Sequence, residues 1–294
     1  MRRLPQIKLL PDGRRLHLND GPIDLIVEAN GNGADVRAAY AAAARRFDGL
    51  LDELCAELAE LRKAAHPVHC HLKGVVARRM HAAVAPFARN CFITPMAAVA
   101  GSVAEEILGA MLGVAQMRRA YVNNGGDIAL HLEGGQQFCI GLIDRPDQLG
   151  IMHTLMVDAA HLSRGIATSG RHGRSFSLGI ADAVTVLAKT AAQADAAATI
   201  IGNAVDLPGH PAIVRRPANE LQPDSDLGSR LVTCEVGRLS DGEVMQALSG
   251  GEGVARNLLA AGLIDGAALR LSGEILVVGT YDQRAHHERE LETA

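Results

Sequence analysis

Apolar residues recur along this chain either at the spacing of a helix or in short runs and alternations typical of strands. The helical spacing marks the predicted helices. Between Ala34 and Ala64 leucines recur at helical spacing, which predicts a helical segment whose leucine stripe faces the core, with Gly49 offering a break. Further helices are predicted near 75–84, over about 97–112, from Thr190 to about Asn203, and near 242–261. The leucines of the stripe are Leu50, Leu51, Leu54, Leu58 and Leu61.

Short β-branched or alternating runs predict the strands. They lie at 14–18, 23–28, 120–123, 128–132, 138–143, 151–157, 161–167, 183–187, 231–236, 268–271 and 275–280. Asp20-Gly21 favours a hairpin between the first two, Ser272-Gly273 one between the last two, and 151–157 and 161–167 resemble a further antiparallel pair. Strands gather in the middle with helices on either side, so we expect an α+β fold with largely antiparallel sheet.

The chain of 294 residues is long enough for one large domain with two lobes or for two packed domains. The four prolines of 207–228 predict a long ordered loop or an interdomain crossing. A strand, helix and hairpin unit is expected at 229–282, and a frayed tail at 284–294.

Composition narrows the classes of partner. A net charge of −4 from 29 basic and 33 acidic residues gives no basic field for nucleic acid. The N-terminal residues do not form a signal-peptide pattern, and no uninterrupted apolar run approaches about 18 residues, so we expect a cytoplasmic protein without a membrane partner. Five widely spaced cysteines indicate reduced thiols, and a homo-oligomer remains open.

The segment 165–205 is the strongest candidate for a site. Asp195 and Thr199 are four residues apart, so both oxygens share one helix face. Alanines surround Asp195, and an unpaired buried carboxylate costs several kcal/mol, which a magnesium ion shared with ligand phosphates would offset. Alternatively, Asp195 answers the dipole of its helix, and Thr199 bonds back to a carbonyl.

Two glycine-containing turns could join this site. In the first, Asn124, Gly125 and Gly126 would let a ligand approach the backbone, and Asp127 could accept hydrogen bonds from a sugar or ring imide; the alternative is a plain turn between strands. In the second, polar and cationic groups suit a phosphate, and the alternative is a polar surface turn. Its members are Thr168, Ser169, Gly170, Arg171, His172 and Arg174.

Two other groups favour simpler interpretations. His66, His69, Cys70 and His71 form a dense group in which His69 and His71 would share a face of an extended segment. No second cluster completes a tetrahedral site, so a polar turn is favoured over zinc. Ser102 does not lie in a nucleophile elbow, which argues against a serine hydrolase.

The order of these motifs resembles the ApbE-like superfamily, whose best-known members are flavin transferases. The likeness covers about 95–205. Its first segment, 95–101, is similar to the family's Gly-Lys-containing segment. The segments that follow, in order, are Gly125-Gly126-Asp127, Ala167-Thr168-Ser169-Gly170, Thr185-Val186 and 194–199. The segment 216–228 further resembles an uncharacterised cytoplasmic branch.

The resemblance implies a single ApbE-like domain over 1–294, with duplicated antiparallel sheet and helix units of T-fold type. It implies magnesium ligation by Asp195, Thr199 and a backbone carbonyl near Val99. It also implies contact between FAD or FMN and a set formed by Asn124, Gly125, Gly126, Asp127, Thr168, Ser169, Gly170 and Arg174. Transferases of this family cleave FAD with magnesium and attach the FMN half to a partner protein.

The chain also departs from the transferase pattern. Ala100 stands where transferases carry Lys, and Ser102 stands where an aromatic residue is usual. The family's His-His-x-x-Asp-Pro block is replaced by 171–182, within which Asp182 and His172 are the candidate catalytic residues; a folding role as a turn residue is the alternative for Asp182.

The sequence therefore predicts binding of a flavin or related phosphorylated nucleotide with magnesium, with phosphoryl or flavinyl transfer to an unidentified acceptor protein as one version. Two alternatives stay open. One is a cofactor-binding protein without catalysis, favoured by the lost Lys and His-His-x-x-Asp-Pro block. The other is an enzyme that uses the pocket for a different small ring substrate, favoured by His172, Arg174 and Asp182.

Overall fold

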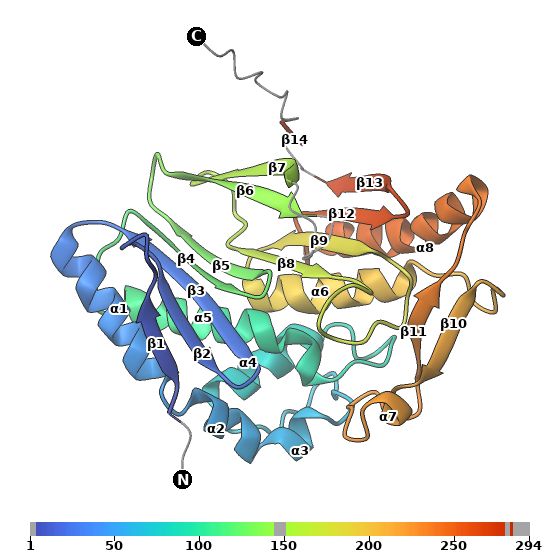
Figure 1. Ribbon diagram of the computed structural model, residues 1–294, viewed down its shortest axis with the longest axis horizontal. Helices are drawn as coiled ribbons and strands as arrows, with labels where there is room; N and C mark the ends of the chain where they lie inside the picture. Colours follow the sequence, from blue (N-terminus) through green and yellow to red (C-terminus); the bar gives the residue numbers. More distant parts are fainter. Residues whose placement is uncertain (1–3, 144–150, 280–282, 285–294) are drawn as a thin grey trace.

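A nine-stranded antiparallel sheet organises the molecule (Figure 1). The computed structural model describes residues 4–143, 151–279 and 283–284. The sheet order is β1-β2-β3-β4-β5-β8-β9-β12-β13, and every neighbouring pair is antiparallel. The strands are β1 (Gln6–Leu9), β2 (Leu16–Asp20), β3 (Ile23–Asn30), β4 (Arg119–Asn124), β5 (Asp127–Leu132), β8 (Gly165–Ser169), β9 (Ala183–Ala188), β12 (Gly266–Leu271) and β13 (Glu274–Gly279).

Helices cover one face of this sheet, with α5 and α6 beneath its centre (Figure 1). α5 packs against α1, α4 and α6, and α6 packs against α8. The helices are α1 (Gly33–Phe47), α2 (Leu50–Ala56), α3 (Leu58–Leu61), α4 (Val75–Val84), the 3-10 helix η1 (Pro95–Ala98), α5 (Val99–Leu112), α6 (Ala191–Ala204), α7 (Ala218–Leu221) and α8 (Asp241–Ala260).

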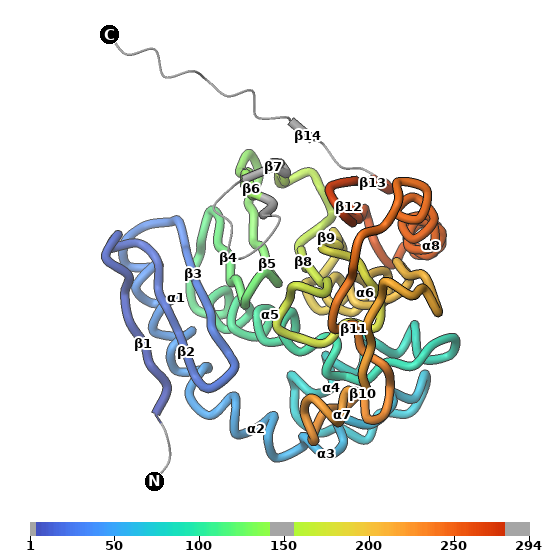
Figure 2. The backbone as a smooth tube through the Cα atoms, turned by 45° about the vertical axis from the view of Figure 1, so that its right-hand side comes forward, coloured from blue at the N-terminus to red at the C-terminus, as the bar shows by residue number. Residues whose placement is uncertain are grey.

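Two smaller sheets complete the fold. One contains β6 (Gln137–Ile143), β7 (Ile151–Asp158) and β14 (Gln283–Arg284), in the order β14-β7-β6. The other pairs β10 (Ile213–Pro217) with β11 (Leu231–Val236). Figures 1 and 2 both show α7 near α3, where Arg62 forms an ion pair with Asp224 at 2.7 Å.

The core divides into two clusters on the helical face and a small third cluster on the opposite face. The first cluster lies among β2–β4, α1, α4 and α5, and the second lies among β8, β9, β12, α6 and α8. Alternation along β5 separates the faces, because Ala129 joins the first cluster and Leu130 joins the third, beneath the β6–β7 hairpin. This mixed, antiparallel architecture confirms the predicted α+β class.

Most predicted elements form, and local signals set several of their ends. Gly49 breaks the helical segment 34–64 with a φ of 84°, which is costly for residues with a side chain beyond hydrogen. Thr190 caps α6 by accepting from the Gln193 N–H, and Ser240 and Glu243 form a capping box at α8.

Three predictions about the elements need correction. β7 pairs with β6, whereas β8 pairs with β5 and β9, so 151–157 and 161–167 are not partners. The segment 207–228 is not only a loop, since it contains β10 and α7. Of the predicted tail, Arg284 lies in β14, and 285–294 lie outside the described residues.

One helical stretch, Pro95–Leu112, is long and apolar enough by length and composition to cross a membrane. Half of it is buried within the protein. Its two acidic residues, Glu105 and Glu106, pair with Arg79 of α4. In this structure the stretch is a core helix of the fold.

Candidate functional site

The candidate site lies where the ends of β4, β5 and β8 meet the first turns of α5 and α6. Asp127 begins β5, and Asn124 ends β4 on the other side of the Gly125-Gly126 turn. Asp195 lies in the second turn of α6. The antiparallel register of β5 and β8 brings Thr168 beside Asp127. Residues far apart in the chain therefore meet at one end of the sheet.

A close crossing of α5 and α6 positions Asp195. A Cβ on Gly101 would lie 2.3 Å from the carbonyl oxygen of Ala191, so glycine permits this approach. Across the crossing, the Gly101 N–H donates to Asp195 Oδ2 at 3.0 Å, and Ala100 adds a second backbone hydrogen bond. The negative charge of Asp195 therefore lies at the N-terminal, positive end of the α5 dipole. The alternative drawn from the sequence placed this charge at the dipole of its own helix, α6.

Asp127 is the second carboxylate of the site. Its Oδ1 accepts the Thr168 N–H at 3.2 Å. Burial raises the pKa of Asp127 to about 7, although the Thr168 hydrogen bond and the charge of Arg174 both lower it. The side chain therefore retains a proton more strongly than an exposed aspartate does.

The two carboxylates influence each other. Burial raises the pKa of Asp195 well above its ordinary value, the charge of Asp127 raises it further, and the amides of Gly101 and Ala100 lower it. Two like charges close together in a partly buried site disfavour ionisation of both. A bound cation would relieve this repulsion, and magnesium is typically held by one or two carboxylates, so the donor set fits a hard divalent cation.

The turn between β4 and β5 has the backbone that its glycines predict. Gly125 and Gly126 have φ values of 66° and 112°. The Asn124 side chain is buried and donates to the Ala100 carbonyl at 3.2 Å, which ties the turn to the start of α5. The guanidinium of Arg174 lies against Gly125.

The Thr168-Ser169-Gly170 run does not point in one direction. Thr168 Oγ1 hydrogen bonds to Thr185 Oγ1 at 2.9 Å across the strand pair. A Cβ on Gly202 of α6 would lie 3.9 Å from Ser169 Oγ, so Ser169 faces the helical layer. At Gly170, a Cβ would lie 2.3 Å from the Asp182 carbonyl, so chain fills that space. In this run, Thr168 contacts Asp127 through its backbone.

The remaining predicted metal ligands lie nearby. Thr199 is one turn beyond Asp195 on α6 and is partly buried. Val99 is the first residue of α5, directly before the two residues whose amides bond to Asp195. Ligation by either residue stays a prediction. Among the described residues, no group of three or more His, Cys, Asp or Glu side chains is arranged to hold a metal.

Asp182 and His172 form a separate polar cluster. Asp182 Oδ1 accepts from Arg171 Nε at 2.9 Å and lies 3.2 Å from His172 Nε2. Its Oδ2 accepts the N–H of Ser272 at 2.6 Å, and Ser272 has a φ of 51° in the β12–β13 turn. These bonds tie the loop after β8 to that hairpin, which supports the folding role; catalysis by Asp182 and His172 stays a prediction.

The histidine group lines a cavity of about 50 Å³ between α3, α4 and η1. His66, His69 and His71 line it together with His81, whereas Cys70 does not. The Nδ1 atom of His66 accepts the N–H groups of Val68 and His69 at 3.1 and 3.0 Å, as expected for a polar turn. His69 and His71 thus line one cavity, and their shared face of an extended segment stays a prediction.

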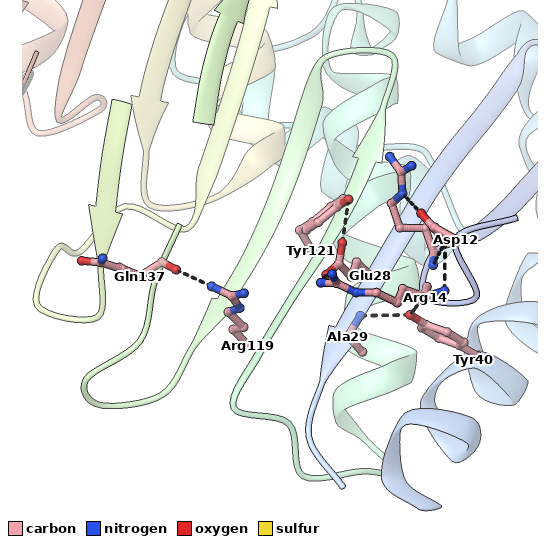
Figure 3. A network of polar contacts seen from close by, with 9 residues as sticks. Asp12, Arg14, Glu28, Ala29, Tyr40, Arg119, Tyr121 and Gln137 are labelled. Carbon is pink, nitrogen blue, oxygen red and sulfur yellow. Dashed lines mark hydrogen bonds and ion pairs between the residues drawn. The ribbon is translucent and has the colours of Figure 1, made fainter. Parts of the chain in front are cut away.

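A second polar network, drawn in Figure 3, joins side chains on the sheet face opposite the helices to the loop before β2 and to α1. Tyr121 donates to Glu28 at 3.3 Å, and Arg14 pairs with the same carboxylate at 2.6 Å. Burial and the Glu28 charge raise the pKa of Tyr121 to about 12. Tyr40 accepts the Ala29 N–H and donates to the Arg14 carbonyl, so the network fastens the loop before β2 to β3 and α1.

The sequence did not predict the groups that hold Asp195 and the start of α6 in place. The amides of Ala100 and Gly101 carry no side-chain signal, and Gly101 was recognised only as part of a motif. Glu105 of α5 was also missed: it accepts the Ala192 N–H at 2.7 Å at the start of α6 and pairs with Arg79. Helical spacing places Glu105 one turn beyond Gly101. That spacing could have indicated that Glu105 lies on the same face of α5 as Gly101.

The chain is similar in sequence to several UPF0280 proteins. The UPF0280 protein of Archaeoglobus fulgidus is 34% identical over 139 residues, 47% of this chain and 54% of the relative. The UPF0280 protein of Methanococcus vannielii is 40% identical over 117 residues, 39% of this chain and 46% of the relative. The chain thus spans about half the length of the curated relatives it matches.

A solved structure and a family model cover more of the chain. The crystal structure of Pseudomonas stutzeri flavinyl transferase ApbE, apo form, matches with a TM-score of 0.47 and 11% identity over 94% of this chain and 95% of that chain. At these values the match carries no argument about activity. The family model described as AbpE bacteria matches residues 7–277. The chain therefore belongs to this AbpE bacteria family, within the ApbE-like superfamily that its motifs predicted.

Proposed function

We propose that this protein binds a flavin or a related phosphorylated nucleotide together with magnesium at the Asp127–Asp195 site. The observation that carries the proposal is the pair of partly buried carboxylates whose pKa values are raised by burial, with the charge of Asp127 raising that of Asp195 further. Such a pair is stabilised by a divalent cation, and the cation in turn attracts phosphate oxygens. Family membership supports the flavin as the ligand.

Asp195 and Thr199 on α6 would hold the metal, with the Val99 carbonyl as a third ligand and Asp127 facing it. The metal would neutralise phosphate charge, including charge that develops on phosphoryl oxygens if transfer occurs. The Gly125-Gly126 turn would present open backbone to the ligand, and Asn124 would hold this turn on α5. Thr168 and Ser169 would border the bound ligand through the end of β8.

Cofactor binding without catalysis is the second candidate, and the surroundings of Asp182 favour it. This carboxylate already accepts from Arg171, His172 and the Ser272 amide. A general base must reach the proton that it removes, and these donors compete for the same oxygens. To act as the base in flavinyl transfer, Asp182 would first have to lose a hydrogen bond to one of these three donors.

Calorimetric titration of FMN and FAD in magnesium, followed by an assay of AMP release, tests the proposal. We expect binding by the wild type and at least about tenfold weaker binding by Asp195→Asn, which keeps the shape but loses the charge. Glu235→Gln is the control, because Glu235 is an exposed carboxylate on β11, outside the site.

The outcomes separate the versions. AMP release that is lost in Asp195→Asn supports transfer. Tight binding without AMP release supports the cofactor-binding protein. Undetectable binding of both flavins would contradict both flavin versions.

A further inference from the structure

The space above Gly125 is filled by a side chain of the protein itself. A Cβ on Gly125 would lie 1.7 Å from Arg174 Nη2 and 2.9 Å from Arg174 Cζ. At Gly126, with a φ of 112°, no heavy atom lies within 4 Å of the corresponding position. The guanidinium therefore rests on the first glycine of the turn and leaves the second glycine open.

Arg174 is held there weakly. In addition to its contact with Gly125, Nη1 donates to the Pro22 carbonyl at 3.4 Å, near the limit of a hydrogen bond, and the residue is exposed. Arg171, three residues earlier, forms bonds of 2.9 and 2.6 Å with Asp182. The loop is thus fastened at Arg171, whereas displacement of Arg174 breaks one long hydrogen bond and moves its charge away from Asp127.

The charge of Arg174 acts on the site, since it lowers the pKa of Asp127. A guanidinium binds phosphate through two parallel N–H groups and with more geometric specificity than an ammonium. An anion that entered over Gly126 would therefore meet a cation that already lies beside it and is loosely attached.

We propose that Arg174 is a displaceable arm that rests on Gly125 and moves onto the phosphate of the incoming ligand. The identity of the ligand as a flavin rests on the proposed function, whereas the displacement of the arm by phosphate does not. In this proposal Gly125 provides the space in which Arg174 rests, and Gly126 provides the open backbone that the ligand approaches.

Comparison of FMN with riboflavin isolates this role, because the two share a ring system and differ by the phosphate. We expect Arg174→Ala to weaken FMN binding at least about tenfold, the scale of a charge-assisted bidentate bond, and to change riboflavin binding less than twofold. Arg174→Lys keeps the charge without the fork and should lose affinity to an intermediate degree. Arg89→Ala, at an exposed arginine outside the site, should change neither.

Nuclear magnetic resonance reports the movement itself. The Arg174 Nε–Hε signal, assigned by its loss in Arg174→Ala, should shift when FMN is added and stay in place with riboflavin. Equal losses of FMN and riboflavin affinity in Arg174→Ala, or no loss of either, would overturn the proposal.

Inorganic pyrophosphate separates failure of the arm from failure of the flavin proposal. If neither flavin binds, but pyrophosphate binds the wild type and at least about tenfold more weakly to Arg174→Ala, the arm stands and the flavin proposal fails. If neither the flavins nor pyrophosphate bind, the arm fails as well.

Discussion

Asp127 and Asp195 are the residues on which the proposed site depends, and both hold their protons more tightly than exposed carboxyl groups do. Both are candidates from the sequence, because Asp195 stands among alanines and Asp127 follows a glycine turn, and their functional role stays a prediction. The sequence did not predict that Asp195 would accept the amides of Ala100 and Gly101. Those bonds need two helices to cross, and backbone donors carry no residue-type signal.

The raised pKa of Asp127 predicts how stability changes with pH. The pKa of Asp127 is about 7 in the folded protein and near its ordinary value of 4 in the unfolded chain. Between pH 4 and pH 7 the folded state therefore binds more protons at Asp127 than the unfolded chain does. This contribution therefore favours folding below about pH 4 and is lost as pH rises through 7. Without added metal, we expect the Asp127 contribution to fall by about 3 kcal/mol from pH 5 to pH 8.

Urea unfolding of the wild type and Asp127→Asn across pH 5–8 measures the contribution of Asp127 together with its effect on Asp195, since the difference between the two proteins cancels the titrating groups that Asp127 does not influence. Magnesium added at pH 8 should stabilise the wild type more than the variant, because the cation replaces the lost proton. A difference in free energy of unfolding that does not vary with pH would show that Asp127 titrates normally.

At the scale of elements, α5 and α6 form the candidate site by crossing at Gly101. Periodicity predicted both helices and most strands, since those signals are local. It paired 151–157 with 161–167, whereas β7 joins β6 and β8 lies between β5 and β9. Strand partners depend on contacts between distant segments, which a pattern within one segment does not specify.

Two glycines of α5 provide a matched test of the crossing. At Gly101 an added Cβ would lie 2.3 Å from the Ala191 carbonyl oxygen, whereas at Gly109 no heavy atom lies within 4 Å. We expect Gly101→Ala to lower the free energy of unfolding by roughly 2–4 kcal/mol, because backbone must move. Gly109→Ala should raise it by up to about 1 kcal/mol through helix propensity.

Chemical denaturation of both variants measures the two changes, and flavin titration then shows whether displacement of α5 also weakens the site. Equal effects of the two substitutions on stability would mean that the helices do not approach so closely at Gly101.

At the scale of the whole molecule, the sheet carries a core on its helical face, and the candidate site lies at one end of its central strands, where the two helical-face clusters meet. The motif order predicted the family, which the match over 7–277 confirms. The arm formed by Arg174 lies within 171–182, where the chain departs from the transferase pattern. Its position over Gly125 depends on the loop's path, which the sequence did not reveal.

The most direct test of the account measures FMN affinity with and without magnesium in the wild type and in Asp195→Asn. If the ligand and the metal share one site, each must tighten the binding of the other by the same factor. We predict that magnesium tightens FMN binding at least about fivefold in the wild type, the lower end of a typical coupling, and has no effect in Asp195→Asn. FMN affinity that is independent of magnesium in the wild type, or magnesium dependence that persists in Asp195→Asn, would contradict the account.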